Sequence, residues 1–317
     1  MAKEPFSVAV DTPKMLDLIG ILKESLKIPL KNMKLMVSIM LLVLIPFSLL
    51  ALIHDLVAGP FLIEFEDQES DGGWNLSTSG VHKDIGILAG IESVFFIAFC
   101  VLTPFTMTAT IYASSAIYTG KLLSLMDVFL KIIAIWKRPM ITWLYILLIT
   151  AGYAFLLVMV FVAFTLITNS GTLIALIGLV GLSAMLFLVY LAAVWMLGLV
   201  ISVVEEDCYG MKAIQKAVDL IKGRKLQGFG LMMLLALLIT PIYVLFCLNT
   251  IEDEREPAAR IVIGAIEMVL VCVLKLFTFI AYTVFYYDCK NSQGEEMDME
   301  ERRGLVSTNL YVSHSLP

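Results

Sequence analysis

Three ionisable residues interrupt otherwise apolar stretches and are the first candidates for chemistry. They are Glu92, Glu267 and Lys275. An ionised side chain is costly in lipid, so inside a membrane span it usually marks an ion or substrate pathway, or pairs with another charge. We therefore expect an intramembrane polar site, with Lys275 facing the interior of a helix bundle. The simpler interpretation is a lysine that reaches the membrane surface along its aliphatic stem, with two carboxylates at span boundaries.

Sequence patterns of the common catalytic and metal sites are absent. The chain contains no phosphate-binding G-x-x-x-x-G-K-[ST] loop, no G-x-S-x-G, no H-E-x-x-H and no Cys-x-x-Cys. Its 3 His residues are isolated, and its 5 Cys residues have no metal-ligand spacing. The basic residues are dispersed along the flanks of apolar runs. We therefore predict that the protein is not an enzyme, holds no cofactor or metal and does not bind nucleic acid.

The chain is apolar enough to be embedded in a membrane. Hydrophobic residues make up 60% of it and charged residues 16%. A membrane span needs about 20 mostly apolar residues. Six runs meet this length, which predicts an all-α bundle of six transmembrane helices. The runs cover 35–53, 87–117, 140–166, 172–204, 229–248 and 261–287.

Positive charges predict the orientation of the spans. The segments 1–34, 119–139, 205–228 and 288–317 hold 18 of the 22 Lys and Arg residues. Cytosolic loops carry such an excess, so both termini should be cytosolic. We expect location in the endoplasmic reticulum or another endomembrane, or in the plasma membrane. Asn75 begins an Asn-Leu-Ser sequence in a non-cytosolic loop and is a candidate glycosylation site.

The predicted spans separate the chain into three parts. Residues 1–34 form a cytosolic amphipathic segment and 35–287 the membrane domain. Residues 288–317 form a polar tail with an acidic run followed by Arg302-Arg303. We expect this tail to be disordered and to offer a docking site for a cytosolic protein partner.

Three connecting segments share one amphipathic pattern. Thr12, Ser124 and Asp207 are expected to cap short helices with apolar residues at i, i+3, i+4 and i+7. Such helices lie in the headgroup region or pack on the ends of spans, and their lysines attract anionic lipid. The plan suggests a threefold repeat of interfacial helix and span hairpin, although independent convergence on this plan is the alternative. The expected apolar faces are Met15, Leu18, Ile19, Leu22 and Leu26; Leu125, Val128, Phe129, Ile132, Ile135 and Trp136; and Ala213, Ile214, Ala217, Leu220 and Ile221.

Proline and threonine residues within the spans allow a second interpretation. Pro46, Pro104 and Pro241 should each kink a helix. Thr residues at 103, 106, 108 and 110 surround the second kink. Their hydroxyls could bond the freed carbonyls or could line a polar conduit.

Two motifs carry a resemblance to known families. One runs from Val203-Val204-Glu205 through Gly210, Ala213 and Leu220 to Gly223, and the other covers 282–290 with Tyr287 and Asp288 near its end. They resemble the membrane-domain family attached to bacterial glycerophosphodiester phosphodiesterases. The chain as a whole is similar to a plant family of six-span proteins of undefined role. The resemblance implies a polytopic membrane domain without phosphodiesterase activity, because the catalytic domain of those enzymes is missing here.

These observations predict a non-enzymatic membrane protein that organises or senses lipid, or acts as a scaffold. Its expected partners are membrane lipids, including anionic lipid at the cytosolic face, and a cytosolic protein. The alternative is a transporter or channel for a small solute or lipid, which rests on the prolines, the Thr cluster and Lys275.

Overall fold

The computed structural model describes residues 16–42, 45–47, 49–50, 53–54, 57, 79–121, 123–167, 171–251 and 257–292. Throughout these residues the regular structure is helical, which confirms the predicted all-α class. Asn75, Thr12 and the tail beyond residue 292 lie outside the described residues. The helices are α1 (Leu18–Lys31), α3 (Ser79–Tyr118), α4 (Leu125–Ile135), α5 (Lys137–Ile167), α6 (Gly171–Val204), α7 (Met211–Ile221), the short η1 (Lys222–Arg224), α8 (Lys225–Ile251) and α9 (Pro257–Ser292).

Most of the predicted spans are long, continuous helices. Within the described residues, 5 helical stretches are long and apolar enough to cross a membrane. A bent pair, Leu18–Lys31 with Met33–Phe47, raises the number to 6 if it counts as one span. This range agrees with the six predicted runs. The fourth run, 172–204, forms the uninterrupted helix α6.

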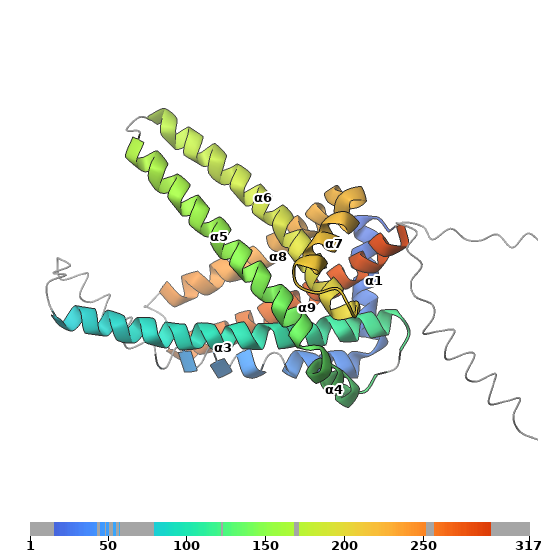
Figure 1. Cartoon of the computed structure of the whole chain (residues 1–317). Helices are drawn as coiled ribbons and strands as arrows, with labels where there is room; N and C mark the ends of the chain where they lie inside the picture. The colour runs from blue at the N-terminus through green and yellow to red at the C-terminus, as the bar shows by residue number, and fades with distance from the viewer. Residues whose placement is uncertain are drawn as a thin grey trace, which may run out of the picture.

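The core lies at one end of the bundle. The ends of α3, α6 and α9 meet there with α1, α4 and α7, and we call this region the connector end (Figure 1). Buried side chains concentrate in the last turns of those three helices, at 107–117, 193–203 and 280–289. Burial of apolar side chains against one another therefore organises this end.

The helices diverge away from the connector end. In Figure 1 the antiparallel pair α5 and α6 projects away from α3. The far halves of these helices expose large apolar side chains, among them Phe155, Phe161 and Phe187. Exposed apolar surface on this scale is costly in water and ordinary in lipid. Five such helices are consistent with a protein embedded in a membrane.

The short helices begin where local hydrogen bonds allow, and two of the predicted caps are wrong. Ser124 and Asp127 form the reciprocal capping box that opens α4, as the sequence predicts for Ser124. However, Leu16 and Asp17 are not helical, and α1 begins at Leu18. Asp17 is its cap, and the Asp17 side chain accepts a hydrogen bond from the Leu18 N–H. Helix α7 is preceded by Gly210 at φ 61°, rather than capped by Asp207. A positive φ favours glycine, which lacks a Cβ.

The Thr cluster on α3 bonds to the backbone of its own helix. The hydroxyls of Thr106, Thr108 and Thr110 donate to the carbonyls of Thr103, Pro104 and Thr106 at 2.6–3.0 Å. Each of these bonds satisfies a hydroxyl that would otherwise need a partner in lipid. This geometry supports the interpretation in which the hydroxyls serve the helix and weakens the polar conduit.

Candidate functional site

A buried ion pair joins the last span to the start of α1. Arg224 of η1 and Asp288 near the end of α9 form a direct ion pair, and their side chains are only 7% and 6% exposed. The same two residues bind the backbone of Leu16 from both sides. Arg224 donates through its second terminal nitrogen to the Leu16 carbonyl at 2.7 Å, and the Leu16 N–H donates to Asp288 Oδ1 at 3.2 Å. The pair therefore fixes where the chain enters α1.

Two further side chains, Gln227 and Phe285, contact Arg224. Its Nε donates to Gln227 Oε1, and the guanidinium lies 5.9 Å from the centre of the Phe285 ring. Aromatic faces attract cations, and this attraction strengthens when water is excluded. Carboxylate, carbonyl and ring together balance the buried positive charge of Arg224.

Glu205 is the centre of a second polar cluster. It lies immediately after α6, where its Oε1 accepts a hydrogen bond of 2.7 Å from the Tyr286 hydroxyl. Lys216 of α7 approaches Oε2 at 3.2 Å, and Lys290 approaches Oε1 at 3.6 Å. One carboxylate therefore joins the ends of α6, α7 and α9. Glu205 and Tyr287–Asp288 belong to two separate sequence motifs, which the fold brings to the same end.

Aromatic residues of α9 bind the neighbouring helices. Tyr287 shares a hydrogen bond of 2.6 Å with Ser115 of α3 and stacks on Tyr118, with ring centres 4.8 Å apart. Tyr282 donates to the Gly228 carbonyl in α8 at 3.1 Å. Tyr282, Tyr287 and Asp288 therefore join α9 to its neighbouring helices through side-chain hydrogen bonds and an ion pair.

The remaining motif residues belong to α7 and its approach. Ala213 and Leu220 are buried, together with the rest of the apolar face predicted for this segment. The Gly210 N–H donates to Thr142 Oγ1 of α5 at 2.7 Å. Gly223 is exposed, and a Cβ there would meet no atom within 4 Å. Gly228, which neither motif contains, needs its small size, since a Cβ there would lie 2.5 Å from Ile221.

The three residues of the predicted intramembrane polar site do not pair with one another in the described part of the chain. Lys275 is exposed on α9 and makes no ion pair with any described residue, and the site that it was expected to form stays a prediction. Glu267 is buried, and its Oε2 has no hydrogen-bond partner. Glu92 instead binds His54, with 2.9 Å between Oε1 and Nε2. Two turns of helix separate Glu267 from Lys275, which explains why the two do not pair.

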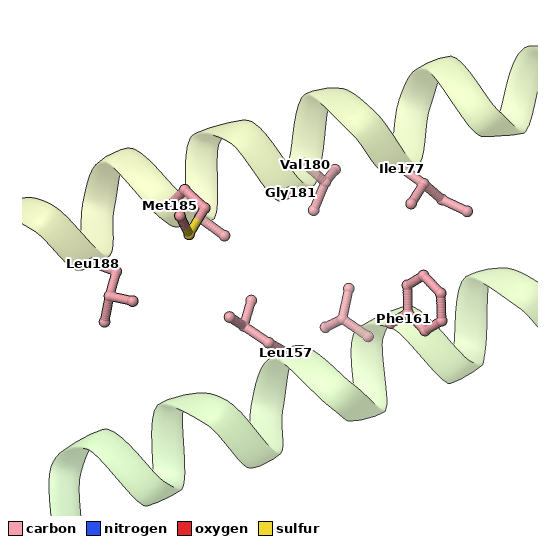
Figure 2. Close-up of a pocket in the computed structure, with 9 residues that line it drawn as sticks. Leu157, Phe161, Ile177, Val180, Gly181, Met185 and Leu188 are labelled. Carbon is pink, nitrogen blue, oxygen red and sulfur yellow. The ribbon is translucent and has the colours of Figure 1, made fainter. Parts of the chain in front are cut away.

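An apolar cleft lies between the far halves of α5 and α6. Its volume is about 300 Å³. Figure 2 shows Leu157 and Phe161 of α5 opposite Ile177, Gly181 and Met185 of α6. At its inner edge, Tyr153 of α5 donates to the carbonyl of Ala184 across the pair at 2.8 Å. The lining offers space for hydrocarbon and no group for acid–base chemistry.

The role of Arg224 could not be predicted from the sequence. An arginine at the start of one span and an aspartate at the end of another offered a signal, but neither residue indicates its partner. Among the described residues, no group of three His, Cys, Asp or Glu side chains could hold a metal ion. The polar groups at the connector end instead join segments of the chain to one another.

The fold and this end of the bundle define an all-α protein with helices suited to a membrane. The chain belongs to a family described as a domain of unknown function (DUF8558), whose model matches residues 9–310. No curated protein and no solved structure matches the chain significantly. The resemblance to the phosphodiesterase-associated membrane domains stays a prediction.

Proposed function

We propose that this chain is a non-enzymatic, multi-pass membrane protein that organises or senses the lipid at one face of a bilayer. The observation that carries the proposal is the exposed apolar surface of α4. Val128, Ile132 and Ile135 are buried on one side of this helix. Other large apolar side chains on it are exposed, namely Met126, Phe129, Leu130 and Ile133.

The position of α4 suggests what covers this exposed surface. The helix connects the ends of α3 and α5, both long enough to span a membrane. A short helix between two spans lies close to the headgroup region, where its apolar side can enter the acyl boundary. Trp136, which follows α4 and stacks with Phe105 at 6.0 Å between ring centres, is a residue type common at that depth.

Helix α7 serves a different role in this proposal. Its apolar face is buried inside the protein, and its outward side carries Lys212, Gln215 and Asp219. It therefore closes the connector end, while α1 and α4 contact lipid. The same amphipathic pattern therefore packs inside the protein in α7 and is proposed to contact lipid in α1 and α4.

The proposed orientation rests on the distribution of Lys and Arg, which places the connector end and both termini in the cytosol. The tail beyond residue 292 would then be available to a cytosolic protein. An endomembrane, including the endoplasmic reticulum, or the plasma membrane is the proposed location.

The contact between α4 and lipid can be measured with native Trp136. A variant with phenylalanine at the other 3 of the 4 tryptophans, Trp74, Trp143 and Trp195, is reconstituted in lipids brominated at different depths. We expect the strongest quenching of Trp136 from bromine near the headgroup. A matched variant that retains only the buried Trp195 should be quenched less. Equal, weak quenching of both would contradict the proposal.

Transport of a small solute or lipid is a second candidate function, favoured by Glu267. A buried carboxylate without a partner in a span is costly unless it serves a purpose. Flux through reconstituted protein that falls in Glu267→Gln would support transport. Flux that is absent, or unchanged in Glu267→Gln, Lys275→Leu and Thr106→Val, would remove this candidate.

A further inference from the structure

The direction of α1 makes it suited to lie along a membrane surface. Its axis is bent by 92° from the following helical segment, Met33–Phe47. If that segment enters the bilayer as the first span, α1 lies parallel to the surface. Leu16, just before α1, is held by Arg224 and Asp288 at the connector end. The start of the helix is therefore held in this position.

Helix α1 has two apolar sides, and only one of them faces the protein. Ile21, Ser25 and Ile28 are buried. Ile19, Leu26 and Leu30 are 73%, 57% and 69% exposed. The spacings i, i+7 and i+11 put these three on one stripe of a helix, opposite the buried side. The protein leaves this stripe uncovered.

Lysines lie beside the exposed stripe and just beyond it. Lys23, Lys27 and Lys31 are exposed on α1, and Lys34 is exposed in the first turn of the segment Met33–Phe47, past the bend. Lys27 forms an ion pair of 2.7 Å with Glu24. Lys23, Lys31 and Lys34 make no ion pair with any described residue. The surface therefore combines an apolar stripe with unneutralised positive charge on its flank.

We propose that this face of α1 binds the surface of a bilayer rich in anionic phospholipid. The apolar stripe matches the acyl boundary, and the lysines match the phosphate and carboxylate groups above it. This inference rests on the proposed function and adds the class of lipid and the helix that selects it. The same face of a second copy is disfavoured here, because it would bring like charges together.

Exposed lysines on α7 and just after it provide the comparison. Lys212 lies on α7, Lys222 begins η1 and Lys225 begins α8, and all three are exposed at the same end of the bundle. The exposed large apolar residues near them, Met211, Val218 and Leu226, do not form a three-residue stripe on one helix like that of α1, because the main apolar face of α7 is buried. Removing three charges from either place changes the net charge equally. Of the two sets, only Lys23, Lys31 and Lys34 should contribute to lipid selection.

The test measures how strongly the full-length protein prefers phosphatidylserine over phosphatidylcholine. Protein labelled at the connector end is placed in vesicles of either lipid with a fluorescent phosphatidylserine, and energy transfer reports enrichment around it. We expect K23Q/K31Q/K34Q to lose most of the preference, at roughly fivefold per lysine at most. K212Q/K222Q/K225Q should retain it. Equal loss in both variants, or no loss in the first, would overturn the inference.

Additional measurements separate lipid binding from a soluble-anion site and from self-association. Inorganic phosphate at constant ionic strength should not reduce the enrichment of phosphatidylserine around the protein, and a reduction would show a soluble-anion site instead. If enrichment appears only as the protein self-associates, the surface is an interface between copies and the inference fails. If the triple variant does not fold, K23Q/K31Q with K212Q/K222Q as control replaces it. Quenching of Trp136 without phosphatidylserine preference would refute this inference alone, whereas absence of that quenching would refute the proposed function.

Discussion

Single residues at the connector end hold together segments that are distant in the chain. The pair of Arg224 and Asp288 binds the backbone of Leu16. Glu205 accepts a hydrogen bond from Tyr286 and forms ion pairs with Lys216 and Lys290. A buried ion pair gains little net energy over an apolar replacement, but removing one partner leaves the other charge uncompensated. These residues therefore act mainly by specifying which segments meet.

Asp288→Ala should destabilise the protein strongly, because it leaves Arg224 buried without its carboxylate. We expect the free energy of unfolding to fall by about 3 kcal/mol. Asp219→Ala is the control, because Asp219 pairs with Lys222 on the exposed surface, and it should cost at most about 1 kcal/mol. Denaturant unfolding in detergent micelles measures both. Similar values for the two variants would contradict the role assigned to Asp288.

Two glycines near the connector end should respond in opposite ways to alanine. At Gly228 a Cβ would lie 2.5 Å from Ile221 Cδ1 and 3.2 Å from Phe285 Cε1, so Gly228→Ala should cost about 1–3 kcal/mol. At Gly223 there is open space, and Gly223→Ala should be neutral or stabilise by about 0.5 kcal/mol. Thermal unfolding of both variants in one detergent tests the pair. The prediction is wrong if Gly223→Ala proves the more damaging.

At the scale of elements, the three connecting helices differ more than their common pattern predicts. Helix α7 buries the whole of its predicted apolar face. Helix α4 buries Val128, Ile132 and Ile135 and exposes the rest. In α1, Ile19 and Leu26 of the predicted face are exposed, and Ile21 and Ile28 are buried instead. How much of each helix is covered is therefore decided by how its particular neighbours pack on it, and not by the pattern alone.

The capping box of α4 should make the start of this helix sensitive to acid. Hydrogen bonds from the Ser124 backbone and side chain hold the pKa of Asp127 below its ordinary value. A lowered pKa means that the cap stabilises α4 above the pKa of an unfolded Asp and loses this effect as pH falls through the folded pKa. Amide exchange in the first turn should therefore be faster in Asp127→Asn than in the native chain at neutral pH.

The difference in amide exchange between Asp127→Asn and the native chain should disappear at acidic pH, where Asp127 is protonated in both folded and unfolded states. Exchange is followed by mass spectrometry, and the comparison at each pH removes the intrinsic pH dependence of exchange. Ser124→Ala should show the same loss at neutral pH. A difference that persists unchanged at acidic pH would show that charge on Asp127 is not the cause.

At the scale of the whole molecule, one closely packed end supports helices that diverge. The buried residues of α6 and α9 lie mainly at 193–203 and 280–289, whereas the described far half of α5 contains exposed and half-buried residues but no buried one. Stability is therefore expected to be unequal along the bundle, since regions with few buried contacts open more easily.

Hydrogen exchange of the intact protein in detergent should reveal this inequality. We expect amides at 280–289 to exchange at least about tenfold more slowly than amides at 152–163, because the former open only when the connector end unfolds. Asp288→Ala should reduce the difference by accelerating exchange at 280–289. Slower exchange at 152–163 than at 280–289 would show that the connector end is not the stable part.

The long helices and one helix cap could be predicted because they depend on local chemistry. Lipid requires about 20 consecutive apolar residues with internally bonded backbone, and that requirement is visible residue by residue in α3, α5, α6 and α9. The cap at Ser124 is also local, because the Ser124 side chain bonds to the N–H of Asp127, three residues along the chain. The start of α1 could not be predicted, because Leu16 is held by residues more than two hundred positions away.

The sequence by itself determined that this chain forms apolar helices of membrane-spanning length, separated by short amphipathic segments. Only the tertiary structure decided that Arg224 meets Asp288, that Lys275 is exposed, and that α1 turns a lysine-flanked apolar stripe outward. The physical reason is that helix formation follows from neighbours in the chain, whereas the burial and pairing of a side chain follow from how distant helices pack.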